Sequence, residues 1–385
     1  MNKIRNLKSR TWAEINLDCI EYNYKAQAEF YKGKAKICCV VKANAYGHGA
    51  IEISRLLESL GADFFAVADI CEALQLREAG IITPILILGY TPPKNAELLA
   101  KNQLSQCVFS YEYAKELADA ATLKGVRIPV HVKIDTGMGR LGFIFRHSSE
   151  ESLSELLDAC SFDCFIHEGI FTHFPASDCS GDGKEFTKRQ FDRFCEVVAL
   201  LEQNGYTFDI RHCSNSAAAI YDPQYALDMV RIGLLLFGAL PSAERSSEFV
   251  PKETMTLKTL ISNIKTVKAG DSIGYGCEYI AKKDMKVATV SIGYADGFLR
   301  TSYPNGIKLT VNGKECDVVG RVCMDQSMID VSNLDDIRVG DEVIVFGKGG
   351  SNSLFDFATK SGTIPHEALC LVGARVPRVY IRNKN

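Results

Sequence analysis

Eight short apolar segments rich in β-branched residues recur through the first 235 residues, and helical patterns separate most of them. The segments are KICCVVKA from residue 36, FFAVAD from 64, PILILGY from 84, SQCVFS from 105, RIPVHVKID from 127, FIHEGIFTHF from 165, DIRHCSN from 209 and DMVRI from 228. Because no hairpin turn joins neighbouring segments, we expect parallel strands with helical crossovers. Eight such units favour a closed (β/α)8 barrel of the TIM type over an open sheet.

The stretches between these segments have apolar residues at three- and four-residue intervals, which predicts amphipathic helices. They cover residues 50–61, 71–80, 94–102, 112–125, 151–160 and 186–205, and several end at glycine or asparagine. The link between the seventh and eighth strands, SAAAIYDPQYAL, predicts only a short helix. That link is the least regular of the predicted units.

The alternation of apolar strands and helical patterns stops after about residue 245. A polar connection, SAERSSEFVPKET, is followed by β-branched stretches punctuated by glycine, and VNGK at 311–314 is a two-residue hairpin signal. We therefore expect an α/β fold with a (β/α)8 barrel over 11–245 and a mostly β C-terminal domain over 246–385. The extreme N-terminal residues could pack with that second domain.

Composition argues against several classes of partner. The chain has 44 Lys and Arg residues against 47 Asp and Glu, with no basic block that could follow a nucleic-acid backbone. The longest apolar stretch, residues 232–240, is far shorter than the roughly 20 residues of a membrane span, and no apolar signal segment begins the chain. The fourteen cysteines lack zinc-like spacing, which indicates reduced thiols in a cytoplasmic protein and no metal site.

Polar residues gather where the predicted barrel strands end, and reactive groups of such barrels lie at the carboxyl ends of strands. Singly, each could be an ordinary polar residue of the surface or core, but their coincidence on one face indicates a site. They are Lys42 and Tyr46 after the first strand, Lys133, Asp135 and Arg140 after the fifth, His173 after the sixth, His212, Ser214, Asn215 and Ser216 after the seventh, and Arg231 in the eighth.

Lys42 follows a strand that the sequence predicts to be buried. A desolvated amine loses its proton readily and can form a Schiff base with an aldehyde. The turn that begins at Ser216 and the backbone at 231–235 could supply hydroxyl and N–H groups to a phosphate. Lys133 and Arg140 would repel each other unless an anion lies between them, and Asp135, a phenolate-like ligand oxygen or a carbamylated Lys133 could each be that anion.

Eight motifs resemble, in order and spacing, the alanine racemases, a family of barrel-type pyridoxal-phosphate enzymes. They are VVKANAYGHGA, VKIDTGMGRLG, FTHFPASD, SNSAA, MVRIGLLLFG, IGYGCEY, IGYADGFLR and GRVCMDQ, and the resemblance runs from Thr11 to Arg378. Barrel-type amino acid decarboxylases have a similar lysine motif and remain the alternative, although their Glu-Pro-Gly-Arg and His-Val-Gly-Ser strings are absent. A barrel that carries the cofactor without turnover is a further alternative, against which the second domain argues.

The resemblance implies that Lys42 holds pyridoxal 5'-phosphate and is one catalytic base, and that Tyr275 of a second protomer is the other. One base on each face of a planar carbanion would interconvert L- and D-alanine, supplying D-alanine for peptidoglycan. The family's bases from two chains imply a homodimer with a shared site. The remaining implied roles are support of catalysis by His173, Arg231, Arg140 and His212; cofactor binding by Tyr46, Ser216, Arg231, Gly233 and Leu234; substrate binding by Arg140, Tyr294, Cys323, Met324 and Asp325; and carbamylation of Lys133.

One position departs from several members of the family. They have a tyrosine before the arginine of the last motif, whereas CLVGARVPR has Ala374. A missing ring beside Tyr275 could admit a larger side chain, so serine is a candidate secondary substrate.

Overall fold

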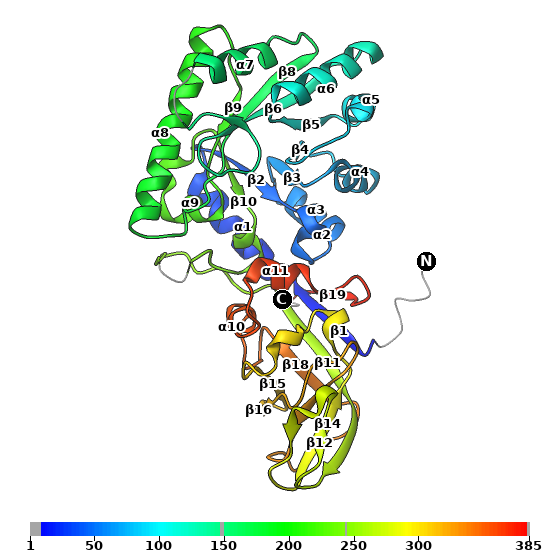
Figure 1. Cartoon of the computed structure of the whole chain (residues 1–385). Coiled ribbons are helices and arrows are strands. Elements are labelled where there is room, and N and C mark those ends of the chain that lie inside the picture. The colour runs from blue at the N-terminus through cyan, green and yellow to red at the C-terminus, as the bar shows by residue number, and fades with distance from the viewer. Residues whose placement is uncertain (1–8, 147–149, 243–244, 383–385) are drawn as a thin grey trace.

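The eight predicted segments form a parallel barrel in the computed structural model, which describes residues 9–146, 150–242 and 245–382. The strand order is β10-β2-β3-β4-β5-β6-β8-β9, and the two end strands contact each other, so the sheet nearly closes (Figure 1). The strands are β2 (Lys36–Val40), β3 (Phe64–Val67), β4 (Ile85–Ile87), β5 (Leu104–Val108), β6 (Ile128–Asp135), β8 (Phe165–Phe171), β9 (Ile210–His212) and β10 (Met229–Ile232), with a short β7 (Phe143–Ile144) beside β6. The predicted barrel is confirmed.

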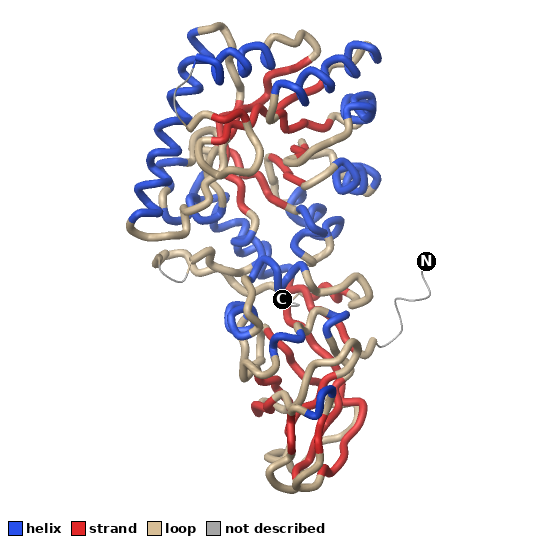
Figure 2. Tube along the Cα trace, viewed as in Figure 1, coloured by secondary structure: helices blue, strands red, loops and turns tan. Residues whose placement is uncertain are grey.

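Helices follow the strands and cover the outside of the barrel (Figure 2). They are α3 (Ala50–Ser59), α4 (Ile70–Glu78), α5 (Ala96–Lys101), α6 (Tyr111–Lys124), α7 (Glu150–Cys160) and α8 (Asp182–Gln203), close to the predicted ranges. The link between β9 and β10 holds only α9 (Ser216–Tyr221) and a single 3-10 turn, which confirms the predicted short helix. Within the described ranges, no helix is both long enough and apolar enough to cross a membrane.

One helix, α1 (Leu17–Tyr31), precedes β2 and was not predicted. The side chain of Asn16 caps it by accepting hydrogen bonds from the backbone N–H groups of Asp18 and Cys19. Its buried face includes the polar residues Asn23 and Gln27. Those polar residues interrupt the apolar period by which a helix is predicted from sequence.

The second domain is built on an eight-stranded, largely antiparallel sheet. Its strands are β11 (Met255–Val267), β14 (Met285–Val290), β15 (Lys308–Val311), β16 (Lys314–Asp317), β17 (Ser327–Asp330), β18 (Glu342–Phe346), β19 (Arg378–Ile381) and β1 (Thr11–Asn16), with a separate pair β12 (Ser272–Ile273) and β13 (Tyr279–Ile280). The predicted hairpin joins β15 to β16, with Asn312 and Gly313 at φ 49° and 75°. Two positive φ values are what a tight two-residue hairpin turn requires.

Both ends of the described chain join this second sheet. β1 pairs antiparallel with β11 and parallel with β19, although residues 11–16 begin the range assigned to the barrel from sequence. Two short helices, α10 (Leu354–Lys360) and α11 (Pro365–Cys370), complete the domain, and α11 lies between the sheet and the barrel (Figure 1). The side chains of Arg378 and Tyr380 bond the backbone oxygens of Gly47 and His48 at 2.7 and 3.0 Å. The second domain therefore braces the loop that follows Lys42.

Candidate functional site

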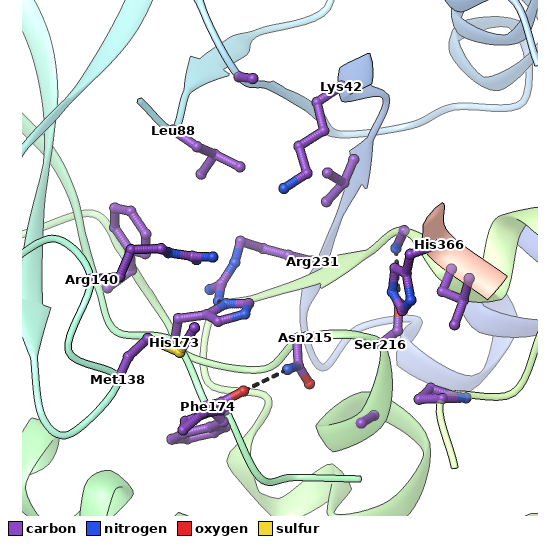
Figure 3. A pocket seen from close by; sticks show the side chains of 18 of the residues that line it. Lys42, Leu88, Met138, Arg140, His173, Phe174, Asn215, Ser216, Arg231 and His366 are labelled. Atoms are coloured by element: carbon purple, nitrogen blue, oxygen red, sulfur yellow. Dashed lines mark hydrogen bonds between the residues drawn. The ribbon is translucent and has the colours of Figure 1, made fainter. Parts of the chain in front are cut away.

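A cavity of about 700 Å³ opens at the carboxyl ends of the barrel strands. Figure 3 shows Lys42 extending into it from one side, with Arg140, His173 and Arg231 across from it. Ten of the residues predicted from sequence line this cavity: Lys42, Tyr46, Lys133, Arg140, His173, Asn215, Ser216, Arg231, Gly233 and Leu234. The structure therefore brings together side chains from strands that are far apart in the sequence.

The backbone after Lys42 makes a left-handed turn. Four consecutive residues without a glycine among them, 43–46, have φ between 52° and 55°. Each such residue costs roughly 1 kcal/mol or more, so the turn must be held by its surroundings. The carboxylate of Glu72 accepts from the N–H of Ala43 at 2.6 Å, and the side chain of Asn44 accepts from the N–H of Ala50 at 2.8 Å. This turn places Tyr46 at the same cavity as Lys42.

Positive charge dominates the cavity. Its lining contains Lys42, Lys133, Arg140 and Arg231, whereas Asp178 is its one carboxylate among the described residues. Burial lowers the pKa of the Lys42 amine, and the nearby Arg140 cation lowers it further. Burial also lowers the pKa of Lys133, assisted by Arg140 and Arg231. The site is thus suited to an anionic ligand and to an amine that reacts in its neutral form.

Asp135 does not lie between Lys133 and Arg140 as their anion. Its carboxylate accepts from the backbone N–H groups of Gly137 and Gly139 and pairs with Arg146 at 3.0 Å. These bonds shape the loop that carries Arg140. Of the three anions that the sequence left open, a ligand oxygen and a carbamylated Lys133 remain.

A small polar cradle lies where β10 ends and α9 begins. The N–H of Gly233 donates to the hydroxyl of Ser216 at 2.9 Å, and a Cβ added at Gly233 would stand 2.6 Å from the Tyr46 hydroxyl. Burial raises the pKa of Tyr46, so its hydroxyl stays protonated and can donate. Asn215 caps α9 by accepting from the N–H of Ala218 at 3.0 Å, which fixes Ser216 at the helix start. Hydroxyls and N–H groups in a cavity that is also lined by cations suit a phosphate.

Arg231 is buried at the base of the cavity, with 4% of its surface exposed. Its guanidinium donates to Nδ1 of His212 at 2.9 Å and to the backbone oxygens of Thr172 and Cys213 at 3.0 and 3.1 Å. Nδ1 of His173 lies 3.2 Å from the same group. Burial, and after it the Arg231 cation, holds the pKa of both histidines well below the ordinary value, so both imidazoles are neutral.

Five other predicted residues lie on the second domain and do not line the cavity of their own chain. Tyr275, Tyr294 and Met324 are 64%, 42% and 54% exposed. The N–H of Tyr294 donates to the backbone oxygen of Cys323 at 3.0 Å, and Asp325 pairs with Arg375 at 2.6 Å. Tyr294, Cys323, Met324 and Asp325 thus form one surface patch. Within a single chain, the structure does not bring this patch or Tyr275 to Lys42.

His366 was missed by the sequence reasoning. It lies on α11, lines the cavity, and its ring centroid is 6.0 Å from that of Tyr46. Burial lowers its pKa, and the Lys42 cation does so as well. A lone histidine in the other domain carries no sequence signal that places it near Lys42.

Both domains match known family models. The alanine racemase N-terminal domain covers residues 15–241, and the alanine racemase C-terminal domain covers 254–380. A curated alanine racemase of Desulforamulus reducens is 43% identical over 376 residues, which are 97% of this chain and 100% of the relative. One of Methanococcus maripaludis is 42% identical, over 96% of this chain and 98% of the relative.

Solved structures agree with the sequence matches. The alanine racemase of Clostridium difficile superposes with a TM-score of 0.92 at 41% identity, covering 98% of this chain and 97% of that one. That of Bacillus anthracis, solved with bound L-Ala-P, gives a TM-score of 0.91 at 34% identity and the same coverage. This chain therefore belongs to the alanine racemases, a family of isomerases.

Proposed function

We propose that this chain binds pyridoxal 5'-phosphate in the barrel cavity and interconverts L- and D-alanine with two bases. The observation that carries the proposal is the placement of Lys42, a half-buried amine whose pKa is lowered, opposite a polar cradle and among cations. An aldehyde that bears a phosphate matches all three features: the amine for the aldehyde, the cradle for the phosphate, and the excess positive charge for both anionic groups.

In this proposal, Ser216, Tyr46 and the backbone of Gly233 and Leu234 would hold the phosphate, and Arg140 would bind the phenolic oxygen. When bound, the cofactor withdraws electrons from the substrate's α-carbon and so makes its proton acidic. Lys42 moves that proton on one face of the substrate. Arg231 would bind at the ring nitrogen, where a cation would discourage protonation.

The second base is Tyr275 of another copy of the chain. Its own chain leaves it largely exposed and away from the cavity, which supports a role across an interface. In a two-fold dimer, each chain would offer Tyr275, Tyr294 and the 323–325 segment to the cavity of its partner. There the backbone N–H of Met324 would bind the substrate carboxylate, Tyr294 would narrow the cavity mouth, and the neutral His173 would support the tyrosine.

Two features bear on substrate and setting. Position 374 is an exposed alanine, so no aromatic ring stands there beside the proposed position of Tyr275. We propose serine as a secondary substrate on that ground. The cysteines at 38, 39, 107 and 213 are buried without disulfides, which supports a reducing cytoplasm, where D-alanine for peptidoglycan would be made.

The test is to titrate purified apoprotein with pyridoxal phosphate and follow racemisation by polarimetry, with L-alanine and L-serine on the same sample. We expect a visible absorption band from cofactor bound to Lys42, together with racemisation that is faster for alanine. Lys42→Ala should lose the band and lower the rate by on the order of 10³-fold. A wild-type protein that stays colourless, or that releases carbon dioxide from alanine, would contradict the proposal.

A further inference from the structure

A row of buried polar side chains runs from Arg231 through the barrel interior, away from the cavity. Nδ1 of His212 lies 2.9 Å from Arg231, Nε2 of His212 lies 2.8 Å from Nδ1 of His131, and Nε2 of His131 lies 3.0 Å from the Glu168 carboxylate. Both histidines are fully buried, and the Glu168 side chain is 26% exposed. None of His212, His131 and Glu168 lines the cavity.

Hydrogen counting gives this row one direction. A guanidinium can only donate, so Nδ1 of His212 accepts from Arg231 and the hydrogen of the neutral His212 is on Nε2. That hydrogen is donated to Nδ1 of His131. Nδ1 of His131 carries no hydrogen of its own. If it did, Nε2 of His212 would have to accept that hydrogen, and His212 would then have no hydrogen on either ring nitrogen. The hydrogen of His131 is therefore on Nε2 and is donated to Glu168.

The local backbone is shaped to make these contacts. In the pairing of β6 with β8, the register passes from Val130 opposite His167 to His131 opposite Gly169, so Glu168 is the extra residue of a β-bulge. A Cβ on Gly169 would lie 2.4 Å from Nδ1 of His131. Only glycine leaves room for this imidazole. The hydroxyl of Ser105 also donates to the Glu168 carboxylate.

The positive charge of Arg231 indicates what this row of side chains does. Among the ion pairs of the described residues none includes Arg231, whose partners are neutral imidazoles and backbone oxygens. A buried cation without a counter-ion is costly, and the lining of the cavity adds further cations. Glu168 is the carboxylate that this chain of hydrogen bonds connects to Arg231. The ring of His212 stacks on Phe171 at 4.8 Å with an interplanar angle of 8°, which fixes its plane.

We propose that Glu168 is a positioning residue for Arg231, acting through His131 and His212. Its carboxylate fixes the hydrogens of both imidazoles on Nε2, so that Nδ1 of His212 always accepts from Arg231. The guanidinium is then held at the base of the cavity in one orientation. The consequence for catalysis rests on the proposed function, because it assumes that Arg231 faces the cofactor ring. The positions of the hydrogens on His131 and His212 do not depend on that assumption.

The first test reads the hydrogens directly, by ¹⁵N NMR of the imidazoles in the wild-type holoenzyme, with assignment from His131→Asn and His212→Asn. We expect both residues to be neutral and to carry the hydrogen on Nε2. A hydrogen on Nδ1 of either residue would overturn the proposal. This result does not depend on racemase activity, so it separates the proposal from a failure of the proposed function.

The second test is a double-mutant cycle. Loss of the outer partner of a metal-bound histidine typically costs about 10- to 100-fold in activity, and Glu168 stands in the same relation to His131. Glu168→Gln removes the negative charge and can turn an amide N–H toward His131, so it should lower kcat by about tenfold with an unchanged KM for alanine. Asp228→Asn is the matched control, since it removes a carboxylate that pairs with Arg211 at 2.8 Å and has no contact with the row. It should leave kcat unchanged.

Glu168→Gln added to His131→Asn should lower kcat no further, because the connection is already cut. Losses that multiply, or a control that falls equally, would show that Glu168 acts only on the fold and would overturn the proposal.

Discussion

The backbone N–H of Gly233 donates to the hydroxyl of Ser216 at 2.9 Å, which ties the end of β10 to the start of α9. A methyl group at position 233 would stand 2.6 Å from the Tyr46 hydroxyl. Gly233→Ala should therefore push Tyr46 out of the cradle and weaken pyridoxal phosphate binding by roughly 10- to 100-fold, the worth of a hydrogen bond to a charged group.

Fluorescence titration of the apoprotein measures this binding. The backbone of Gly233 has φ −127° and ψ −81°, outside the regions that alanine favours, so thermal unfolding of both apoproteins is recorded to show that the variant is folded at the temperature of the titration. Equal cofactor affinity in the two proteins would remove Gly233 from the phosphate site.

Lys42 should react as a neutral amine at a lower pH than the ordinary lysine value of 10.5. Its pKa is lowered by burial first and by the Arg140 cation next. Arg140→Gln removes the second effect, so the pKa of Lys42 rises and its reaction shifts to higher pH. Competitive acetylation of the apoprotein across pH, read by peptide mass, measures the midpoint.

Arg211→Gln is the control for this experiment, because Arg211 pairs with Asp228 and does not line the cavity. It should leave the Lys42 midpoint in place. A midpoint that does not move in Arg140→Gln would mean that burial alone sets the reactivity of Lys42.

Lys133 should become carbamylated in bicarbonate buffer. Its amine is buried beside Phe171, its pKa is lowered by burial and by Arg140 and Arg231, and a neutral amine is the form that adds carbon dioxide. The product carries a negative charge that Arg140 could bind. With ¹³C-bicarbonate, we expect a carbamate carbon signal by NMR that is absent from Lys133→Gln. If the wild type gives no such signal, a ligand oxygen is the anion beside Arg140.

Ala374→Tyr should raise the preference for alanine over serine. A ring at position 374 would occupy space beside the proposed position of Tyr275 and so restrict larger substrates, and a difference of one group in a pocket is worth roughly tenfold or more. The ratio of kcat/KM for the two amino acids is the measurement, with Ala374→Ser as a control that adds no ring. An unchanged ratio in the tyrosine variant would show that position 374 does not affect the choice between alanine and serine.

The barrel could be predicted from sequence because its strands are continuous apolar runs and its helices keep a regular apolar period. The cavity side of the site followed, since a barrel places strand ends together whatever lies between them in the chain. Local geometry that opposes residue preference could not be predicted. Alanine and tyrosine favour a right-handed backbone, yet residues 43–46 turn left-handed because the contacts of Glu72 and Asn44 hold them.

Long-range partners were also beyond the sequence. His366 lines the cavity only because α11 of the second domain lies against the barrel, and Glu168 reaches His131 only through a bulge that shifts the register by one residue. Neither a contact between domains nor a β-bulge produces a periodic pattern in the sequence from which it could be predicted. Tyr275 is exposed in its own chain, and the proposed function assigns it to the site of another chain.

The central claim is that Lys42 of one chain works with Tyr275 of another. Separately, Lys42→Ala and Tyr275→Phe should each lose activity by about 10²- to 10⁴-fold, the usual contribution of a catalytic acid or base. When the two variants are expressed together with different tags, purified mixed dimers hold one site with both residues intact and one with neither. We predict about half of the wild-type racemase activity per mixed dimer, because one of two equivalent sites is restored. Mixed dimers no more active than the two parent variants, or a chain that forms no dimer, would contradict the claim.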